Sequence, residues 1–148
     1  MINCMTLLKS MKSLRSQTPI YAFKIIKAFR PSCHKTSDHY LLARIVIPSN
    51  TKMILCSYTN MIQSANMTIT DIDNPRDLDL SKYKCNGVRF SHHKDYTLNE
   101  EYVITNDPSD MEKTGVGFYS YPTSSLAKIY LDDLYRAQFI NASHTYHV

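Results

Sequence analysis

The sequence predicts a strand-rich α+β domain of about six or seven strands, closed by one C-terminal helix and preceded by an amphipathic N-terminal helix. Runs of β-branched and aromatic residues, which are typical of strands, recur along most of the chain. The segment after Pro122 instead carries apolar residues at helical spacing. The length of 148 residues suits one core. We therefore expect an extension at 1–18, the α+β core at 19–137 and a tail at 138–148.

Basic residues are concentrated at the front of the chain. The net charge is +4, from 17 basic and 13 acidic residues. No acidic residue precedes Asp38, so the remainder of the chain is mildly negative. Such an asymmetry is typical of an arm that contacts a nucleic acid, a membrane surface or another protein.

The segment 1–16 predicts an amphipathic helix that ends before Pro19. Its apolar stripe and the cations around it form the expected docking element: Cys4, Leu7, Leu8, Met11 and Leu14, with Lys9, Lys12 and Arg15. Four roles stay open for this helix. It could pack on the domain or a neighbouring subunit, dock on a membrane surface, act as a mitochondrial presequence, or form a tail attracted to nucleic acid.

The core is expected to hold strands bounded by turn-forming polar segments and prolines. In order, these strands are 20–29, 40–48, 53–58, 67–72, a hairpin of 84–90 with 96–104, and 115–121. The apolar segment 40–48 predicts a central strand, because strands covered on both faces carry nearly continuous apolar residues.

The closing helix is expected from Pro122-Thr123 to about Arg136. Thr123 or Ser124 can cap its first amides. Its expected buried face consists of Leu126, Ala127, Tyr130 and Leu134. We therefore expect this helix to lie on the sheet.

Two groups of histidines and cysteines are candidates for a metal site: Cys33 with His34 and His39, and Cys85 with His92 and His93. Structural zinc ligands are usually paired at short regular spacing, which neither group shows. No phosphate-binding loop, nucleophile elbow or dinucleotide fingerprint occurs. We predict no catalytic residue, metal or cofactor. The four scattered cysteines indicate reduced thiols in an intracellular setting.

Basic and aromatic residues alternate within Tyr21–Arg30 and again within Tyr83–Phe90. A sheet that presents such side chains can stack bases and bind phosphates. The candidate contacts are Lys24, Lys27 and Arg30. The slightly acidic remainder of the chain argues against a dedicated nucleic-acid binder.

The C-terminal half resembles a family of small uncharacterised domains of giant and other large DNA viruses, with phage relatives. The resemblance rests on "KYKCNGVRF", "YTLNEEYVI" and "TGVGFYSYPTSSLAKIY", with "YLLARIVIPSNTKMI" before them, and covers about residues 20–131. The matching motif positions are Gly115, Val116, Phe118, Tyr119, Ala127 and Tyr130, and Gly117 belongs to the same strand. The family's cysteine before the glycine is absent here, and Gly117 replaces its histidine. The resemblance therefore implies a viral origin and a non-catalytic role.

A fainter likeness to ADP-ribosyltransferase-type folds lacks the late catalytic acid, because Glu112 is the last glutamate. The expected function is a non-enzymatic viral interaction protein, or a virion component such as a minor capsid or internal protein. Its partners would be other proteins, itself included, in the host cytoplasm, the viral factory or the virion. The alternatives are a nucleic-acid binder and, third, an enzyme.

Overall fold

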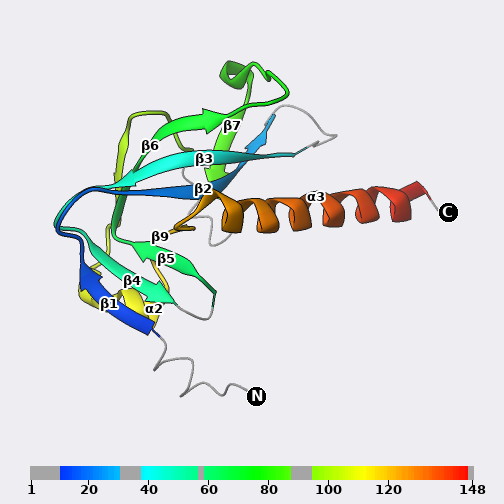
Figure 1. The fold of residues 1–148 in the computed structure, drawn as a ribbon. Helices are drawn as coiled ribbons and strands as arrows, with labels where there is room; N and C mark the ends of the chain where they lie inside the picture. The colour runs from blue at the N-terminus through cyan, green and yellow to red at the C-terminus, as the bar shows by residue number, and fades with distance from the viewer. Residues whose placement is uncertain (1–10, 31–37, 57–58, 88–94, 147–148) are drawn as a thin grey trace, which may run out of the picture.

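Two antiparallel β-sheets and a long C-terminal helix make up the structure, a computed structural model (Figure 1). It describes residues 11–30, 38–56, 59–87 and 95–146. The first sheet has the strand order β1-β4-β5-β9, formed by Met11–Arg15, Lys52–Cys56, Met61–Ser64 and Phe118–Ser120. The second has the order β7-β2-β3-β6-β8, formed by Lys84–Gly87, Ile20–Phe29, His39–Ile47, Asn66–Asp73 and Glu101–Val103.

Short helices join some of these strands, and one long helix follows them. The two 3-10 turns are η1, Leu80–Lys82, and η2, Pro108–Asp110. Helix α2 spans Met111–Thr114, and α3 spans Ser124–Tyr146. The described residues thus form nine strands in two sheets, which confirms the α+β class but exceeds the predicted number of strands.

Hydrogen bonds join the connecting segments where the chain passes from one sheet to the other. Between β1 and β2, the buried Ser16 donates its amide to the Thr51 carbonyl at 2.9 Å and its hydroxyl to the Pro48 carbonyl at 2.7 Å. At another junction, Phe23 of β2 and Tyr121 after β9 exchange backbone hydrogen bonds of 2.8 and 2.6 Å. The two sheets therefore enclose one core.

That core follows from side-chain alternation in β2 and β3. Ala22 lies opposite Ile45 and Ile26 opposite Leu41, and all four side chains are buried between the sheets. Alternate residues point to the other face of a strand. Ile25 and Leu42, which are paired on that other face, are also buried.

Helix α3 covers this outer face of β2 and β3. Its first turn is capped, since the Leu126 amide donates to Thr123 Oγ1 at 3.3 Å, as expected for a threonine before a helix. Ala127 is fully buried and permits a close approach of helix and sheet. Figure 1 shows that α3 then continues past the end of the sheet.

The predicted N-terminal helix is wrong over its last residues. Met11–Arg15 form strand β1, which pairs antiparallel with β4 and sets Leu14 opposite Met53. Leu14 packs against the main core. Pairing with β4 has overridden the local helical pattern, because tertiary contacts outweigh weak propensities. Residues 1–10 lie outside the described residues.

The predicted hairpin of 84–90 with 96–104 is also wrong. β7 pairs with β2, and β8 pairs with β6, so they occupy opposite edges of the five-stranded sheet. Within the described residues, the Tyr96 amide donates to the Cys85 carbonyl at 2.6 Å and so links the two segments.

The predicted helix boundary and tail need correction too. The expected end at about Arg136 is too early, and the expected tail at 138–148 is helical as far as Tyr146. The strand expected at 115–121 is shortened to Phe118–Ser120, because Gly115 ends α2 in the left-handed conformation. β5, Met61–Ser64, was not predicted.

Candidate functional site

A cleft of about 460 Å³ lies between α3 and the start of β3. Side chains from the helix, from β3 and from the turn after β6 line it: Tyr40, Leu42, Asp73, Pro75, Lys128 and Tyr135. Its walls are mostly apolar, with two tyrosines, one carboxylate and one ammonium. A cleft of this size and composition suits a ligand with a flat apolar part.

The two tyrosines of the cleft hold each other in place. Tyr135 Oη donates to the Tyr40 carbonyl at 2.5 Å, and the two rings meet edge to face with centroids 6.0 Å apart. Burial, followed by the charge of Asp38 and the neighbouring Tyr130, raises the pKa of Tyr40. Its phenol therefore stays protonated at neutral pH and remains a hydrogen-bond donor.

The cleft opens onto a continuous series of cationic and aromatic side chains. We call this series the cation–aromatic row; its members are, in spatial order, Arg30, Tyr83, His39, Arg76, Tyr135 and Tyr40. Figure 1 shows that the end of β2, the start of β3 and β7 lie at the same end of the sheet. The row therefore joins residues up to about a hundred positions apart in the sequence.

Each contact in the row is short. The Arg30 guanidinium lies 5.6 Å from the Tyr83 ring centroid, and Tyr83 meets the His39 ring edge to face at 5.6 Å. Arg76 Nη1 lies 3.5 Å from His39 Nδ1. The Arg76 guanidinium is also 5.6 Å from the Tyr135 ring centroid. Such stacking orients a guanidinium while its N–H groups stay available.

Neither arginine of the row pairs with a carboxylate of the described residues. Ion pairs among the described residues join Arg44 to Asp73 at 3.7 Å and Lys84 to Asp95 at 3.6 Å. Arg30 takes no part in them, and neither does Arg76. Both side chains are exposed. They can therefore bind an anionic group, and guanidinium geometry favours phosphate or carboxylate.

Lys24, one of the expected nucleic-acid contacts, lies inside the molecule. It points between the sheets, is 6% exposed, and donates from Nζ to the Tyr119 carbonyl at 2.8 Å. Its ammonium also lies 5.8 Å from the Tyr96 ring centroid. Burial lowers the pKa of Lys24 from 10.5 to about 8. This side chain cannot reach a phosphate at the surface.

The other two expected contacts are at the surface. Lys27 is half-buried and its ammonium lies over the Phe29 ring, 5.6 Å from the centroid. Arg30 is a member of the cation–aromatic row. The structure therefore separates the three predicted residues and brings one of them to the row.

The predicted docking residues fall into two groups. Cys4, Leu7, Leu8 and Lys9 lie outside the described residues. The backbones of Met11 and Lys12 belong to β1, where Arg15 Nη1 also donates to the Asn50 carbonyl at 2.9 Å. The residues from Met11 onward thus take part in the sheet and form no separate helix.

The glycine–aromatic motif builds a tight corner. At Gly117, φ is +144°, and an added Cβ would lie 2.9 Å from Gln63 Cγ and 3.1 Å from the Ser64 carbonyl. Tyr119 Oη donates to the Gly115 carbonyl. Phe118 enters the core. This corner brings β9 directly against β5.

The motif's helical residues, Ala127 and Tyr130, seat α3 on the sheets. Ala127 is fully buried. The ring of Tyr130 packs 6.3 Å from that of Tyr121.

The structure describes one member of each group of metal candidates, His39 of the first and Cys85 of the second. Among residues 11–30, 38–56, 59–87 and 95–146, no group of three or more His, Cys, Asp or Glu side chains could hold a metal ion. His39 belongs to the row, whereas Cys85 is buried. Burial, and then the charge of Asp95, raises the pKa of the Cys85 thiol. Cys33, His34, His92 and His93 lie outside the described residues.

No helix in the described part of the chain is long and apolar enough to cross a membrane. Comparison of the chain with protein-family models, curated proteins and solved structures finds no match. Function must therefore be inferred from the chemistry of the surfaces themselves.

The sequence did not identify Arg76, Tyr135 or Tyr40 as site residues. Arg76 lies in the turn after β6, where a polar residue is unremarkable. Tyr40 and Tyr135 lie in segments expected as a strand and a helix. The sequence analysis did identify the segments that contain Arg30 and Tyr83, but only the pairing of β2 with β7 shows that they lie side by side.

Proposed function

We propose that the protein binds single-stranded nucleic acid through the cation–aromatic row and the adjoining cleft. The observation that carries this proposal is the alternation of tyrosine rings with guanidinium groups that form no ion pair within the described part of the chain. Single strands are bound by cations that follow the backbone and by rings that stack on bases. The cleft of about 460 Å³ offers room for a base beside Tyr40 and Tyr135.

The binding energy is expected to come from two kinds of side chain, the basic groups that contact phosphates and the tyrosine rings that stack on bases. Arg30, Arg76 and Lys128 would contact phosphates, and each contact to a single strand lowers the slope of log K against log salt by about 0.7. Three contacts give a slope of about −2. Stacking on Tyr40 or Tyr135 would add about 1–3 kcal/mol per base.

The test is a fluorescence anisotropy titration of a labelled 20-nucleotide oligothymidine at several salt concentrations. We expect measurable affinity with a slope near −2, which Arg76→Gln reduces in magnitude by about 0.7. Lys113→Ala removes the same charge from exposed α2, in the part of the molecule away from the row, and should leave the slope unchanged. Equal loss in both variants would show that binding is nonspecific attraction to net charge.

A protein partner is the second candidate, and α3 is the observation that favours it. The helix spans 23 residues, or about 34 Å at 1.5 Å per residue. Gln138 donates to the Asp38 carbonyl at 2.8 Å, and the helical backbone continues for eight residues beyond it. In this case the protein would be a non-enzymatic viral or virion interaction protein that pairs with a second copy of itself. Light scattering should then report a dimer that becomes a monomer when the chain ends at Gln138.

A further inference from the structure

The carboxylate of Asp73 lines the cleft but takes no part in the binding of phosphates or in stacking. Asp73 ends β6 and is paired with Leu42 of β3. Residues that are directly opposite in neighbouring strands have their side chains on the same face of the sheet. Leu42 is buried on the face that α3 covers. The side chain of Asp73 therefore lies on the helix side of the sheet, as one wall of the cleft.

The opposite wall of the cleft is a stripe of α3. It consists of Lys128, Leu131 and Tyr135, whose spacing of three and then four residues places them on one face of a helix. Lys128 is exposed and forms no ion pair with Asp73. The carboxylate and the ammonium are therefore on separate walls, with the cleft between them.

The oxygens of Asp73 remain able to accept hydrogen bonds. Arg44 Nε lies 3.7 Å from Oδ1, which is an ion pair but too long for a hydrogen bond. Within the described residues, neither oxygen accepts a side-chain hydrogen bond. The next residue, Asn74, is fully engaged, since its side chain bonds the amide and the carbonyl of Leu78 at 3.0 and 2.8 Å. These bonds fix the turn that begins at Asp73.

Cations outnumber this carboxylate around the cleft. Lys128 is on the opposite wall, and the Arg76 guanidinium lies over the Tyr135 ring. Both groups repel a cationic ligand and attract an anionic one. The group that suits Asp73 is therefore a neutral N–H donor, on a ligand that carries its negative charge elsewhere. A nucleotide has both properties.

Guanine is the base that matches a carboxylate best. Its N1–H and its N2 amino group are adjacent donors, so they can bond both carboxylate oxygens at once. Adenine and cytosine have an amino donor beside a ring-nitrogen acceptor, and thymine has an N–H between two carbonyl acceptors. In these three bases a lone pair would face one carboxylate oxygen, which is repulsive.

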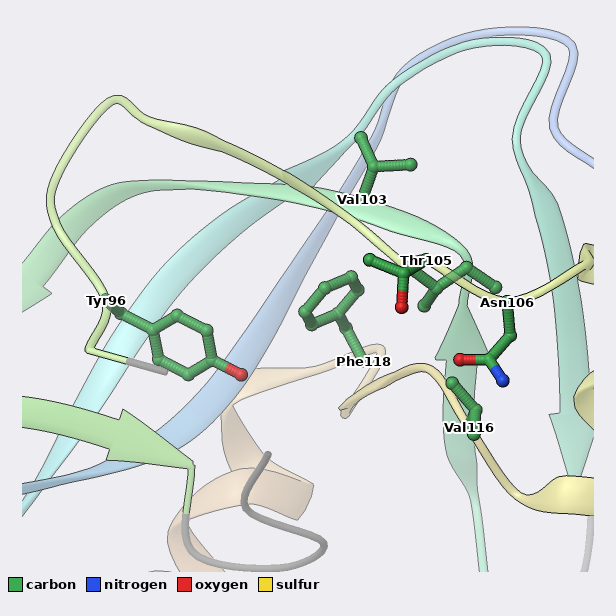
Figure 2. Close-up of a pocket in the computed structure, with 7 residues that line it drawn as sticks. Tyr96, Val103, Thr105, Asn106, Val116 and Phe118 are labelled. Carbon is green, nitrogen blue, oxygen red and sulfur yellow. The ribbon is translucent and has the colours of Figure 1, made fainter. Parts of the chain in front are cut away.

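A smaller cavity of about 90 Å³, beside β9, does not offer a comparable arrangement. Figure 2 shows the Phe118 ring between the Tyr96 phenol and the side chains of Thr105 and Asn106. An apolar ring thus separates the polar groups of this cavity, and its described lining includes no carboxylate.

We propose that Asp73 makes the cleft select guanine, by accepting hydrogen bonds from N1–H and the N2 amino group of one base. This inference rests on the proposed nucleic-acid function and adds a base preference to it. Lys128 keeps its contact with a phosphate, and Tyr40 or Tyr135 keeps its contact with the face of the base. Asp73 thus determines specificity, whereas the cations provide attraction for any sequence.

The test is fluorescence anisotropy with labelled nonamers, each of which has four thymidines on either side of one variable nucleotide. We expect guanine at the centre to bind about tenfold more tightly than adenine, cytosine or thymine, because two hydrogen bonds to a charged group are gained. Hypoxanthine keeps N1–H and lacks the N2 amino group, so it should bind about fivefold more weakly than guanine. This comparison requires no change to the protein.

Asp73→Asn tests the residue itself, since it keeps the shape and replaces one acceptor oxygen with a donor. The ratio of guanine to thymine affinity should fall from about ten to below about three. The ratio is the readout because the lost negative charge strengthens the binding of every strand alike. Asp71→Asn is the matched control. It removes the same charge from an exposed residue of β6 that does not line the cleft, and should keep the ratio at about ten.

The outcomes separate this inference from the proposed function. Guanine selection is wrong, and nucleic-acid binding stands, if all nonamers bind equally, if hypoxanthine matches guanine, or if Asp73→Asn keeps the ratio. If no nonamer binds, the proposed function fails, and an amide NMR titration with guanosine monophosphate decides the inference. Saturable shifts at residues 40–42, 73–75 and 128–135 that adenosine monophosphate does not produce would assign the cleft to a free guanine nucleotide. Equal shifts with both nucleotides, or none, would overturn guanine selection.

Discussion

Replacing the buried Lys24 with methionine should change how stability depends on pH. Burial lowers the pKa of this lysine from 10.5 to about 8 in the folded state. Between these values the unfolded chain binds more protons than the folded chain, so the free energy of unfolding rises with pH. The penalty for the buried charge is present in full below pH 8 and disappears as pH rises toward 10.5.

The size of the effect follows from the same two values. At pH 7 the buried ammonium costs about 3 kcal/mol, and at pH 9.5 the cost falls to about 1 kcal/mol. The unaltered protein should therefore gain about 2 kcal/mol from this residue over that interval. Methionine has a similar unbranched shape and does not titrate, so it keeps the packing and removes the gain.

Urea denaturation at pH 7, 8, 8.75 and 9.5 measures this difference. Titration of the groups away from Lys24 is common to both proteins and cancels when their unfolding free energies are subtracted. Tyr96 is the exception, because its ring centroid lies 5.8 Å from the Lys24 ammonium. The range stops below pH 10, because the pKa of Tyr96, raised to about 12, contributes stability that is lost as pH rises from 10 to 12.

Lys27→Met, on the opposite and partly exposed face of β2, is the control. If the unfolding free energies of Lys24→Met and the unaltered protein changed in parallel with pH, the buried position of the ammonium would be refuted.

Three other changes test the packing. Gly117→Val should lower the unfolding free energy by about 3 kcal/mol, since the new side chain would collide with Gln63 and the backbone has a positive φ. A urea midpoint equal to that of the unaltered protein would contradict the close packing at Gly117. Gly115→Asn should cost under about 1 kcal/mol by the same measurement, because asparagine tolerates the left-handed conformation at the end of α2; a loss as large as that of Gly117→Val would show that Gly115 is also closely packed. Deleting residues 1–17 removes β1 and should lower the thermal midpoint by several degrees more than deleting residues 1–10 does. An equal effect of both deletions would contradict the pairing of β1 with β4.

The long strands could be predicted because their sequences satisfy both local propensity and burial. Ile20–Phe29 and His39–Ile47 are rich in β-branched and aromatic residues and form the centre of the larger sheet. β5 escaped prediction because it buries Gln63 and Ser64, which are rarely interior residues. Gln63 Nε2 donates to the carbonyls of Met111 and Val116 at 3.1 and 2.7 Å, and only the folded chain provides these acceptors.

Strand pairing is a second feature that local sequence does not encode. The segments around Cys85 and Tyr102 are neighbours in the chain, yet each pairs with an earlier strand. The same long-range pairing gathers the candidate site. Arg30 was identified from basic and aromatic interleaving, but its neighbours in the row come from a turn, the start of β3 and a helix.

The central claim is that nucleic acid contacts the cation–aromatic row, and photochemical cross-linking tests the location directly. The full chain is irradiated together with an oligonucleotide that contains 4-thiouridine. The protein is then digested, and the cross-linked peptides are identified by mass spectrometry. We predict cross-links at Tyr40 and Tyr135, which line the cleft, and their loss in Tyr135→Phe combined with Arg76→Gln. Cross-links that fall only on the four-stranded sheet, or that persist unchanged in this double variant, would contradict the account.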